Sequence, residues 1–261
     1  MSSDQVETSV LGSPVQLPCG YLHKDGQIYT DAEIIPMTGI TRKTIARDEI
    51  KSNAARTTDT VLCQCLKRVG PASTITREFV NNLLIGDREF LVVEIRRLSM
   101  GNKATTYVGC SNPKCQKDFH DDIDLGKLKI TTLTADNYVI DKGSRVFKVV
   151  SPQLQLNATF RFPKGEDQHY LVSAKNLVEA NYKLFTLCLL EWNGNNGPFD
   201  DTFFDDTPVA ALDLIEDSFL TRQLGPELKQ SVTCPYCNSS MMLTFKSSDF
   251  LFHRPKRGTD I

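Results

Sequence analysis

The sequence lacks a surplus of either charge. Thirty lysine and arginine residues stand against 32 aspartate and glutamate residues, which gives a formal net charge of −2. Proteins that bind nucleic acid or anionic lipid through a basic surface carry an excess of positive charge. We therefore expect no direct nucleic-acid partner, and function must be sought in local features of the chain.

Long apolar runs are also absent. The longest, at residues 184–192, is interrupted by Thr186 and Glu191 and falls far short of the ~20 residues that a membrane-spanning helix needs. Residues 1–12 are polar and acidic, unlike the basic start and apolar centre of a secretory signal. We expect a protein that stays in a cytoplasm and has no membrane partner.

Signatures of catalysis are missing as well. The sequence contains no glycine-rich phosphate-binding loop, no nucleophile-elbow serine and no His-Glu-x-x-His pair. Its aspartate groups, at 121–124 and 200–206, lack the alternating ligands and the glycine of a calcium-binding loop. We therefore expect no enzyme, no catalytic or cofactor-binding residues and no small-molecule substrate.

The hydrophobic pattern predicts a mixture of helices and strands. Three- and four-residue spacings of apolar side chains predict helices at 41–55, 59–69, 76–98, 168–192 and 208–224, the last capped by Thr207. Alternation and turn residues predict strands at 27–36, 144–150, 154–162, 229–234 and 241–245, and a hairpin over 105–125. The expected fold class is α+β.

A chain of 261 residues can bury one large core or two small ones. Landmarks recur at a nearly constant offset: Cys65 corresponds to Cys188, and Cys110 corresponds to Cys234. We predict two related halves, each with strands, helices and a cysteine hairpin; chance recurrence of common apolar residues is the alternative. The expected boundaries are a flexible N-terminus at 1–14, a first half at 15–130, a second half at 144–246 and a flexible tail at 247–261.

Eight cysteines, at 19, 63, 65, 110, 115, 188, 234 and 237, are the chemically most informative residues. In a reducing compartment, closely spaced cysteines bind metal or perform redox chemistry more often than they form disulfides. The segments at 110–115 and 234–237 each place two thiols at a tight turn between strands, which suits tetrahedral zinc. Asn238, just after the second pair, tolerates the left-handed conformation that such turns use.

One structural zinc shared by Cys110, Cys115, Cys234 and Cys237 is the predicted site, as a zinc-ribbon-like joint between the halves. The chain between the pairs is far longer than the ~15–20 residues of a compact ribbon. Closing so long a loop costs roughly 4 kcal/mol, whereas structural zinc binding contributes about 10–16 kcal/mol. A complete set of four thiolates leaves no position for a reactive water, so the site would be structural.

Other readings of the cysteines stay open. His120 could replace one of the thiols, or all four thiols could be reduced and metal-free. Cys234 and Cys237 could form a redox pair, but they do not stand at a predicted helix start, where the helix dipole would lower a thiol pKa. The other four cysteines are expected to be ordinary core or surface residues.

Several short segments resemble a known family. They are Leu-Pro-Cys-Gly-Tyr at 17–21, Ile-Pro-Met-Thr-Gly at 35–39, Gly-Asp-Arg-Glu-Phe-Leu at 86–91, Ile-Arg at 95–96, Ser-Met-Gly at 99–101, Asp-Leu at 124–125 and the two cysteine pairs. In this order, over about residues 15–246, they resemble the baseplate hub and hub-assembly proteins of T-even-type contractile-tailed phages. Cys19, where a small polar residue is usual, and the long loop at 111–114 depart from the pattern.

The resemblance implies a non-enzymatic protein that joins or chaperones hub components during assembly. Its partners would be other phage baseplate and hub proteins, and its location the virion tail baseplate or the host cytoplasm during assembly. By the same resemblance, Cys110, Cys115, Cys234 and Cys237 would bind the family's zinc. The alternative is a zinc-ribbon adaptor that acts with nucleic acid or a polymerase, because a ribbon is a widely reused fold. A thiol oxidoreductase is the third possibility.

Overall fold

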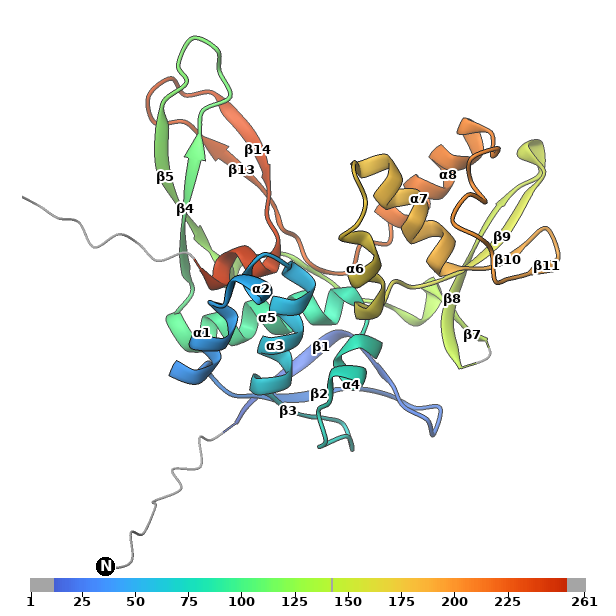
Figure 1. Cartoon of the computed structure of the whole chain (residues 1–261), viewed down its shortest axis with the longest axis horizontal. Coiled ribbons are helices and arrows are strands. Elements are labelled where there is room, and N and C mark those ends of the chain that lie inside the picture. The colour runs from blue at the N-terminus through green and yellow to red at the C-terminus, as the bar shows by residue number, and fades with distance from the viewer. Residues whose placement is uncertain (1–11, 142, 253–261) are drawn as a thin grey trace, which may run out of the picture.

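The computed structural model describes residues 12–141 and 143–252. Its N-terminal part is built on a three-stranded antiparallel sheet in the order β1–β2–β3 (Figure 1). The strands are β1 (Ser13–Leu22), β2 (Ile28–Ile34) and β3 (Leu66–Val69). The accompanying helices are α1 (Gly39–Ile45), α2 (Asp48–Lys51), α3 (Ala54–Cys65), α4 (Arg77–Asn82) and α5 (Ile85–Met100).

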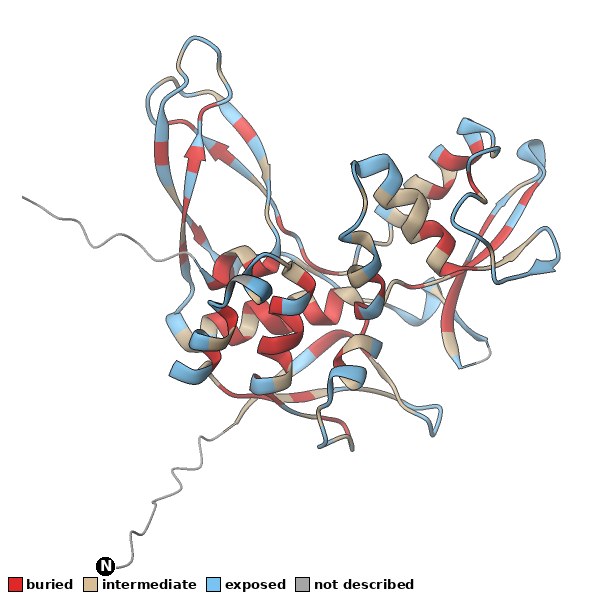
Figure 2. Ribbon diagram, viewed as in Figure 1, coloured by how far each residue is buried: buried red, intermediate tan, exposed pale blue. Residues whose placement is uncertain are grey.

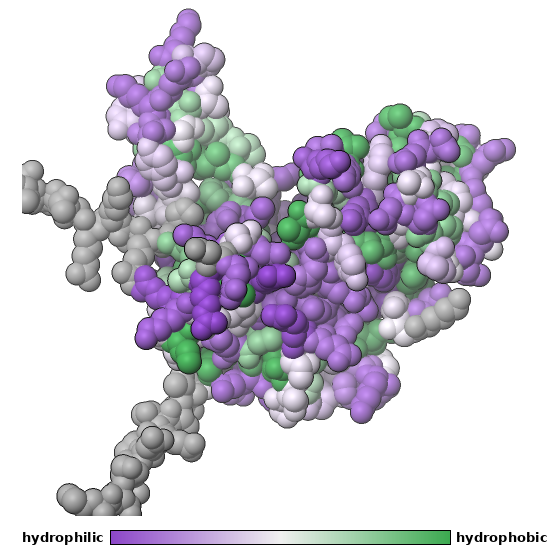
Figure 3. Space-filling view, viewed as in Figure 1, coloured by the Kyte–Doolittle hydropathy of each residue, from purple (hydrophilic) through white to green (hydrophobic). Residues whose placement is uncertain are grey.

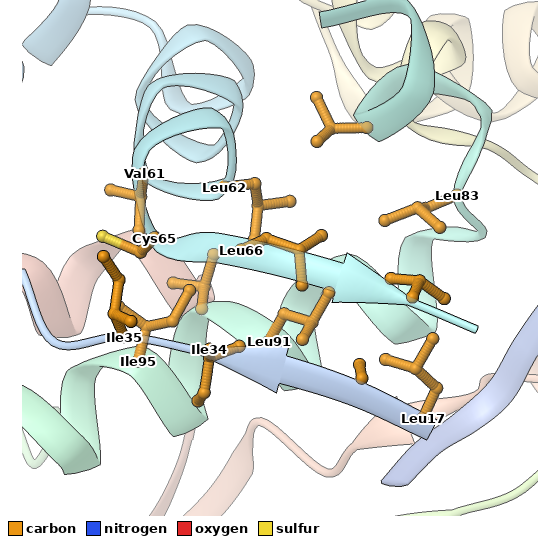
Figure 4. Packing of buried hydrophobic residues seen from close by; sticks show 14 of the residues in the cluster. Leu17, Ile34, Ile35, Val61, Leu62, Cys65, Leu66, Leu83, Leu91 and Ile95 are labelled. Carbon is orange, nitrogen blue, oxygen red and sulfur yellow. The ribbon is translucent and has the colours of Figure 1, made fainter. Parts of the chain in front are cut away.

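Polar caps start these helices and apolar faces fix them to the sheet. The side chains of Asn53 and Thr76 accept hydrogen bonds from the first turns of α3 and α4, as helix caps do. Leu62 of α3 and Leu91 of α5 meet Ile34 of β2 in one buried core (Figure 4). Burial of these aliphatic side chains is the main stabilising contribution to this part of the chain.

A second sheet and three helices follow. The sheet has the order β11–β10–β9–β8–β7, with β7 (Val139–Asp141), β8 (Ser144–Ser151), β9 (Leu156–Arg161), β10 (Leu189–Trp192) and β11 (Asn195–Asn196). The helices are α6 (Gly165–Leu171), α7 (Leu177–Cys188) and α8 (Val209–Leu220). Their shared core is aromatic, with Phe147 and Phe160 packed against Phe219 at centroid distances of 5.2 and 5.3 Å.

Two hairpins rise together from the body as an arm (Figure 1). One is β4 (Lys103–Gly109) with β5 (Asp118–Asp124), and the other is β13 (Lys229–Thr233) with β14 (Ser240–Thr244). A short pair, β6 (Ile130–Thr131) and β12 (Gly225–Pro226), lies near their base. Four 3₁₀ segments complete the described chain: η1 (Leu125–Lys127), η2 (Ala135–Asn137), η3 (Pro152–Leu154) and η4 (Ser247–Leu251). Figure 2 shows buried residues in the two parts that contain sheets and helices, and on the strands of the arm.

The mixed helix and sheet class is confirmed, but several predicted boundaries are wrong. The helices predicted at 59–69 and 168–192 end at Cys65 and Cys188, and the residues that follow form β3 and β10. Leu66 pairs with Ile34, so the end of this apolar run belongs to the sheet. A short apolar run fits a buried strand as well as a helix, which is why periodicity alone misassigned it. Pro208, without a side-chain hydrogen bond, occupies the cap position predicted for Thr207.

The prediction of a loose tail from residue 247 is also corrected. Ser247–Leu251 forms η4, in which Phe250 and Leu251 are buried. The Nε of Arg96 donates a hydrogen bond of 2.9 Å to the carbonyl of Phe250, and this contact fixes η4 to α5. Similarly, β1 starts at Ser13, inside the segment expected to be flexible. Residues 1–11 and 253–261 lie outside the described residues.

Elements in the two parts of the chain follow a similar order. Two antiparallel strands, a helix that ends in a cysteine, a third strand, another helix and a cysteine hairpin occur first as β1, β2, α3, β3, α5 and β4–β5. They occur again as β8, β9, α7, β10, α8 and β13–β14. Descent of both parts from one ancestral unit remains a prediction.

Candidate metal centre

The two hairpin tips bring four thiols together. The Sγ atoms of Cys110, Cys115, Cys234 and Cys237 all lie within 4.8 Å of one another. The distance is 3.6 Å between Cys110 and Cys237 and 3.9 Å between Cys115 and Cys234. Four sulfurs at ~2.3 Å from one ion, in a tetrahedron, are about 3.8 Å apart. The cluster could therefore hold a metal ion.

Tight backbone turns aim each pair of thiols. The N–H of Cys110 donates to the carbonyl of Lys117, and the N–H of Cys234 donates to the carbonyl of Ser239, both at 3.0 Å. Gln116 and Asn238, which directly follow the second cysteine of each pair, have φ angles of 49° and 57°. The left-handed conformation expected at Asn238 is confirmed. The same conformation was not predicted for Gln116, although its position after Cys115 is equivalent.

Polar contacts connect one tip to the other. The side-chain amide of Asn112 donates to the Ser239 hydroxyl at 3.0 Å and contacts the Cys237 sulfur at 3.7 Å. The Lys117 ammonium lies 4.8 Å from the centre of the Tyr236 ring. These four side chains were also missed, and Asn112 and Ser239 were identifiable only as hydrogen-bonding residues close to the cysteines. Such outer contacts orient thiolate ligands.

The thiols have unequal affinities for protons. Hydrogen bonds from the Ser239 side chain and backbone lower the pKa of Cys237 to about 6. The backbone N–H of Asn112 favours the Cys110 thiolate, but desolvation and the neighbouring thiols outweigh this effect and raise the pKa of Cys110 to about 12. The Cys110 thiol, with its raised pKa, therefore stays protonated near neutral pH without a cation. Binding of a divalent metal would therefore release protons.

An apolar cluster supports the tips from below. Val108 and Phe119 of the first hairpin pack against Val232 and Met241 of the second, and all four are buried. Cys110 and Cys234 are also buried, whereas Cys115 and Cys237 are half-buried. The ligand set is therefore presented on two hairpins that pack against each other, and a bound ion would connect residues far apart in the sequence.

His120, the alternative ligand, and the remaining cysteines lie away from this cluster. His120 is exposed on β5 and its ring lies 5.3 Å from that of Tyr107; among the described residues it is not part of the ligand group. Cys65 is buried in the core under α3. Cys19 and Cys188 belong to the aromatic core of the second part. Cys234 and Cys237 lie at a turn between strands, not at a helix start.

The Asp-Arg pair at 87–88 has an internal role. An oxygen of Asp87 accepts a hydrogen bond of 2.7 Å from the N–H of Cys19. The guanidinium of Arg145, from β8, donates to the carbonyls of Cys19 and Gly20. Burial raises the pKa of Asp87 to about 6. The turn at 19–20 is thus held by both parts of the chain, and Arg145 could not be identified from sequence.

Arg88 forms a second connection. Its buried guanidinium donates to Asp59 of α3 and to the carbonyl of Val80, both at 2.7 Å, and to Gln168 of α6 at 3.2 Å. His169 of α6 also lies 3.0 Å from Asp59. The segment at 86–91 that carries the family resemblance therefore joins three helices to α6.

Comparison with known proteins gives one family. The family described as T4 bacteriophage base plate protein matches residues 37–253, which include both cysteine pairs and the Asp-Arg segment. No curated protein and no solved structure matches the chain. Within the described residues, no helix has both the length and the apolar content to cross a membrane. Family membership implies a structural protein of the virion tail that contacts other baseplate proteins. The match covers most of the sequence, so the chain belongs to the T4 bacteriophage base plate protein family.

Proposed function

We propose that this protein is a non-catalytic structural or assembly protein of a contractile-tail baseplate hub, and that its two hairpins share one structural zinc. The zinc proposal is supported by the four cysteine sulfurs, which lie within 4.8 Å of one another. The family supports the baseplate role. The hub and chaperone-like roles, in the host cytoplasm during assembly and then in the virion, are supported by the sequence segments described above.

The zinc would act by fixing the arm. Cys110 and Cys115 lie on one hairpin, and Cys234 and Cys237 on the other, so a shared ion would connect the two tips. The apolar cluster beneath them is small, with only four buried side chains besides the cysteines. Zinc binding coupled to folding contributes about 10–16 kcal/mol, which is at least comparable to the roughly 6–12 kcal/mol that these four side chains supply together at about 1.5–3 kcal/mol each. Without the ion, the hairpins would separate before either lobe unfolds.

We also propose that residues 15–130 and 144–246 are two related halves joined at this site. The similar order of strands and helices supports this division, as do Cys65 and Cys188 at the ends of equivalent helices α3 and α7. Each half contributes one pair of ligands. A shared ion would therefore link the halves in the same way that it links the hairpins.

Native mass spectrometry of the full chain, purified without added metal, tests the zinc proposal. We expect one zinc per chain, lost in Cys110→Ser because three thiolates do not complete the ligand set. Cys63→Ser is the matched control, since Cys63 is half-buried on α3 and outside the cluster; it should retain the ion. A wild-type chain with eight free thiols and no zinc, or full zinc content in Cys110→Ser, would contradict the proposal.

A further inference from the structure

A cavity of about 560 Å³ lies where the base of the arm, the start of α5 and helices α7 and α8 meet. Its wall is largely apolar and includes Leu84, Phe147, Phe162, Phe185, Phe219 and Phe245. Figure 1 shows the arm and the α7–α8 lobe diverging above the body, and Figure 3 shows the surface hollowed between them. The volume falls in the range of sites that enclose ligands, about 300–1,000 Å³.

Two polar groups of the wall lack partners. Glu89 of α5 is half-buried, and among the described residues it accepts no hydrogen bond and forms no ion pair. Arg88, the adjacent cation, is directed to Asp59. The buried Nε of Arg222 likewise has no acceptor in the described part of the chain. Leaving the buried Nε of Arg222 without an acceptor is costly, and the half-buried carboxylate of Glu89 lies in the same wall, which makes both of them points for recognition.

The remaining charges of the cavity are already used or exposed. Glu216 of α8 accepts a hydrogen bond of 3.0 Å from Asn181 of α7. Another nitrogen of Arg222 donates to the carbonyl of Ser218, and its guanidinium lies 4.9 Å from the Phe147 ring. Three further charged residues that line the cavity are exposed, namely Lys129, Glu227 and Lys229. Among the described residues, the wall thus offers a carboxylate that forms no ion pair and a donor without an acceptor.

The surroundings of Glu89 also match a missing cation. Burial raises the pKa of this carboxyl to about 7, which shows that Arg88 only partly compensates its charge. A cation brought to Glu89 would restore the ionised form. An apolar wall next to a carboxylate suits arginine and lysine, whose aliphatic stems pack on rings while the charged end makes a hydrogen-bonded pair.

We propose that this cavity receives a short peptide segment of another protein, in which an arginine or lysine side chain pairs with Glu89 and a backbone carbonyl accepts from Arg222. The flanking residues of the segment would be apolar, to match the phenylalanine wall. The identification of the partner as another baseplate protein rests on the proposed function. The binding chemistry of the cavity is independent of that function. Among the described residues no cysteine lines the cavity, so this proposal and the zinc proposal fail independently.

Two model peptides test the proposal on the full-length protein. The probes are acetyl-Leu-Arg-Phe-amide and its analogue with citrulline, a neutral residue of the same shape, in place of arginine. Titration followed by methyl NMR should show binding at Leu84. The arginine peptide should bind at least tenfold more tightly than the citrulline peptide. Glu89→Gln should abolish this preference. Arg222→Met should weaken both peptides alike, because both offer the same backbone carbonyls.

Controls and alternative occupants complete the test. Asp213→Asn, an exposed change on α8, should leave both affinities unchanged. If Glu89→Gln does not fold, Glu89→Ala also removes the carboxylate and should likewise abolish the preference for the arginine peptide. Equal affinity for the two peptides would overturn the proposal. So would tighter binding by a chain ending at Phe252, which would identify the basic segment 253–261 as the occupant. A concentration-dependent dimer that Glu89→Gln dissociates would instead identify a second copy and also overturn it.

Discussion

At the scale of single residues, Arg88 combines complete burial with several hydrogen bonds. Arg88→Ala would leave the Asp59 carboxylate in the core without its closest cation, at 2.7 Å. We expect a loss of about 3–5 kcal/mol in the free energy of unfolding, measured by urea denaturation. Arg77 is the control, since it is 65% exposed and lies 3.8 Å from the same carboxylate. Arg77→Ala should cost about 0–1 kcal/mol, and equal losses would refute the role of Arg88.

Glu89 predicts a pH-dependent stability. Its pKa rises on folding from 4.5 to about 7, so the folded state binds more protons between these pH values and loses stability as pH rises through them. Glu89→Gln removes this loss. The free energy of unfolding of the variant should equal that of the wild type at pH 4.5 and exceed it by about 1–3 kcal/mol at pH 8. Thermal melts at both pH values check this. For the control Asp213→Asn, we expect the same difference in stability from the wild type at both pH values. The same result for Glu89→Gln would contradict the prediction.

At the scale of elements, close backbone contact joins α5 to the segment before β12. A Cβ added at Gly86 would lie 2.8 Å from the backbone carbon of Leu224, so the two segments would have to move apart. We expect Gly86→Ala to lower the free energy of unfolding by about 1–3 kcal/mol. At Gly39, in α1, a Cβ meets nothing within 4 Å. Gly39→Ala should be neutral or stabilising by up to about 1 kcal/mol. Chemical denaturation of the Gly86→Ala and Gly39→Ala variants measures both effects.

Sequence predicted the elements whose signals are local. The hairpin over 105–125, the cysteine pairs and the left-handed Asn238 all depend on neighbouring residues, and the structure contains each of them. The strands β3 and β10 were missed because their pairing with β2 and β9 is set by distant residues. The same reason hides Asn112 and Ser239, whose hydrogen bond connects positions more than a hundred residues apart.

At the scale of the whole molecule, the cores exchange residues across the proposed boundary. The core under α3 includes Leu251 from η4, and the aromatic core of the second part includes Cys19 and Leu84 from the first. A third cluster combines Val93 with Phe250. Within the described chain, each proposed half therefore depends on residues outside it to complete its core.

This sharing predicts that the halves do not fold alone. A fragment of residues 1–130 lacks Leu251, and it also lacks Phe250 and Leu228 of the third cluster. We expect this fragment to show no cooperative thermal transition, because the apolar surfaces of α5 would stay exposed to water. Mixing it with residues 131–261 should restore the transition of the intact chain. Calorimetry of each fragment, of the mixture and of the full protein measures this. A cooperative transition of fragment 1–130 at the melting temperature of the intact chain would show instead that the halves are independent domains, connected only at the cysteine site.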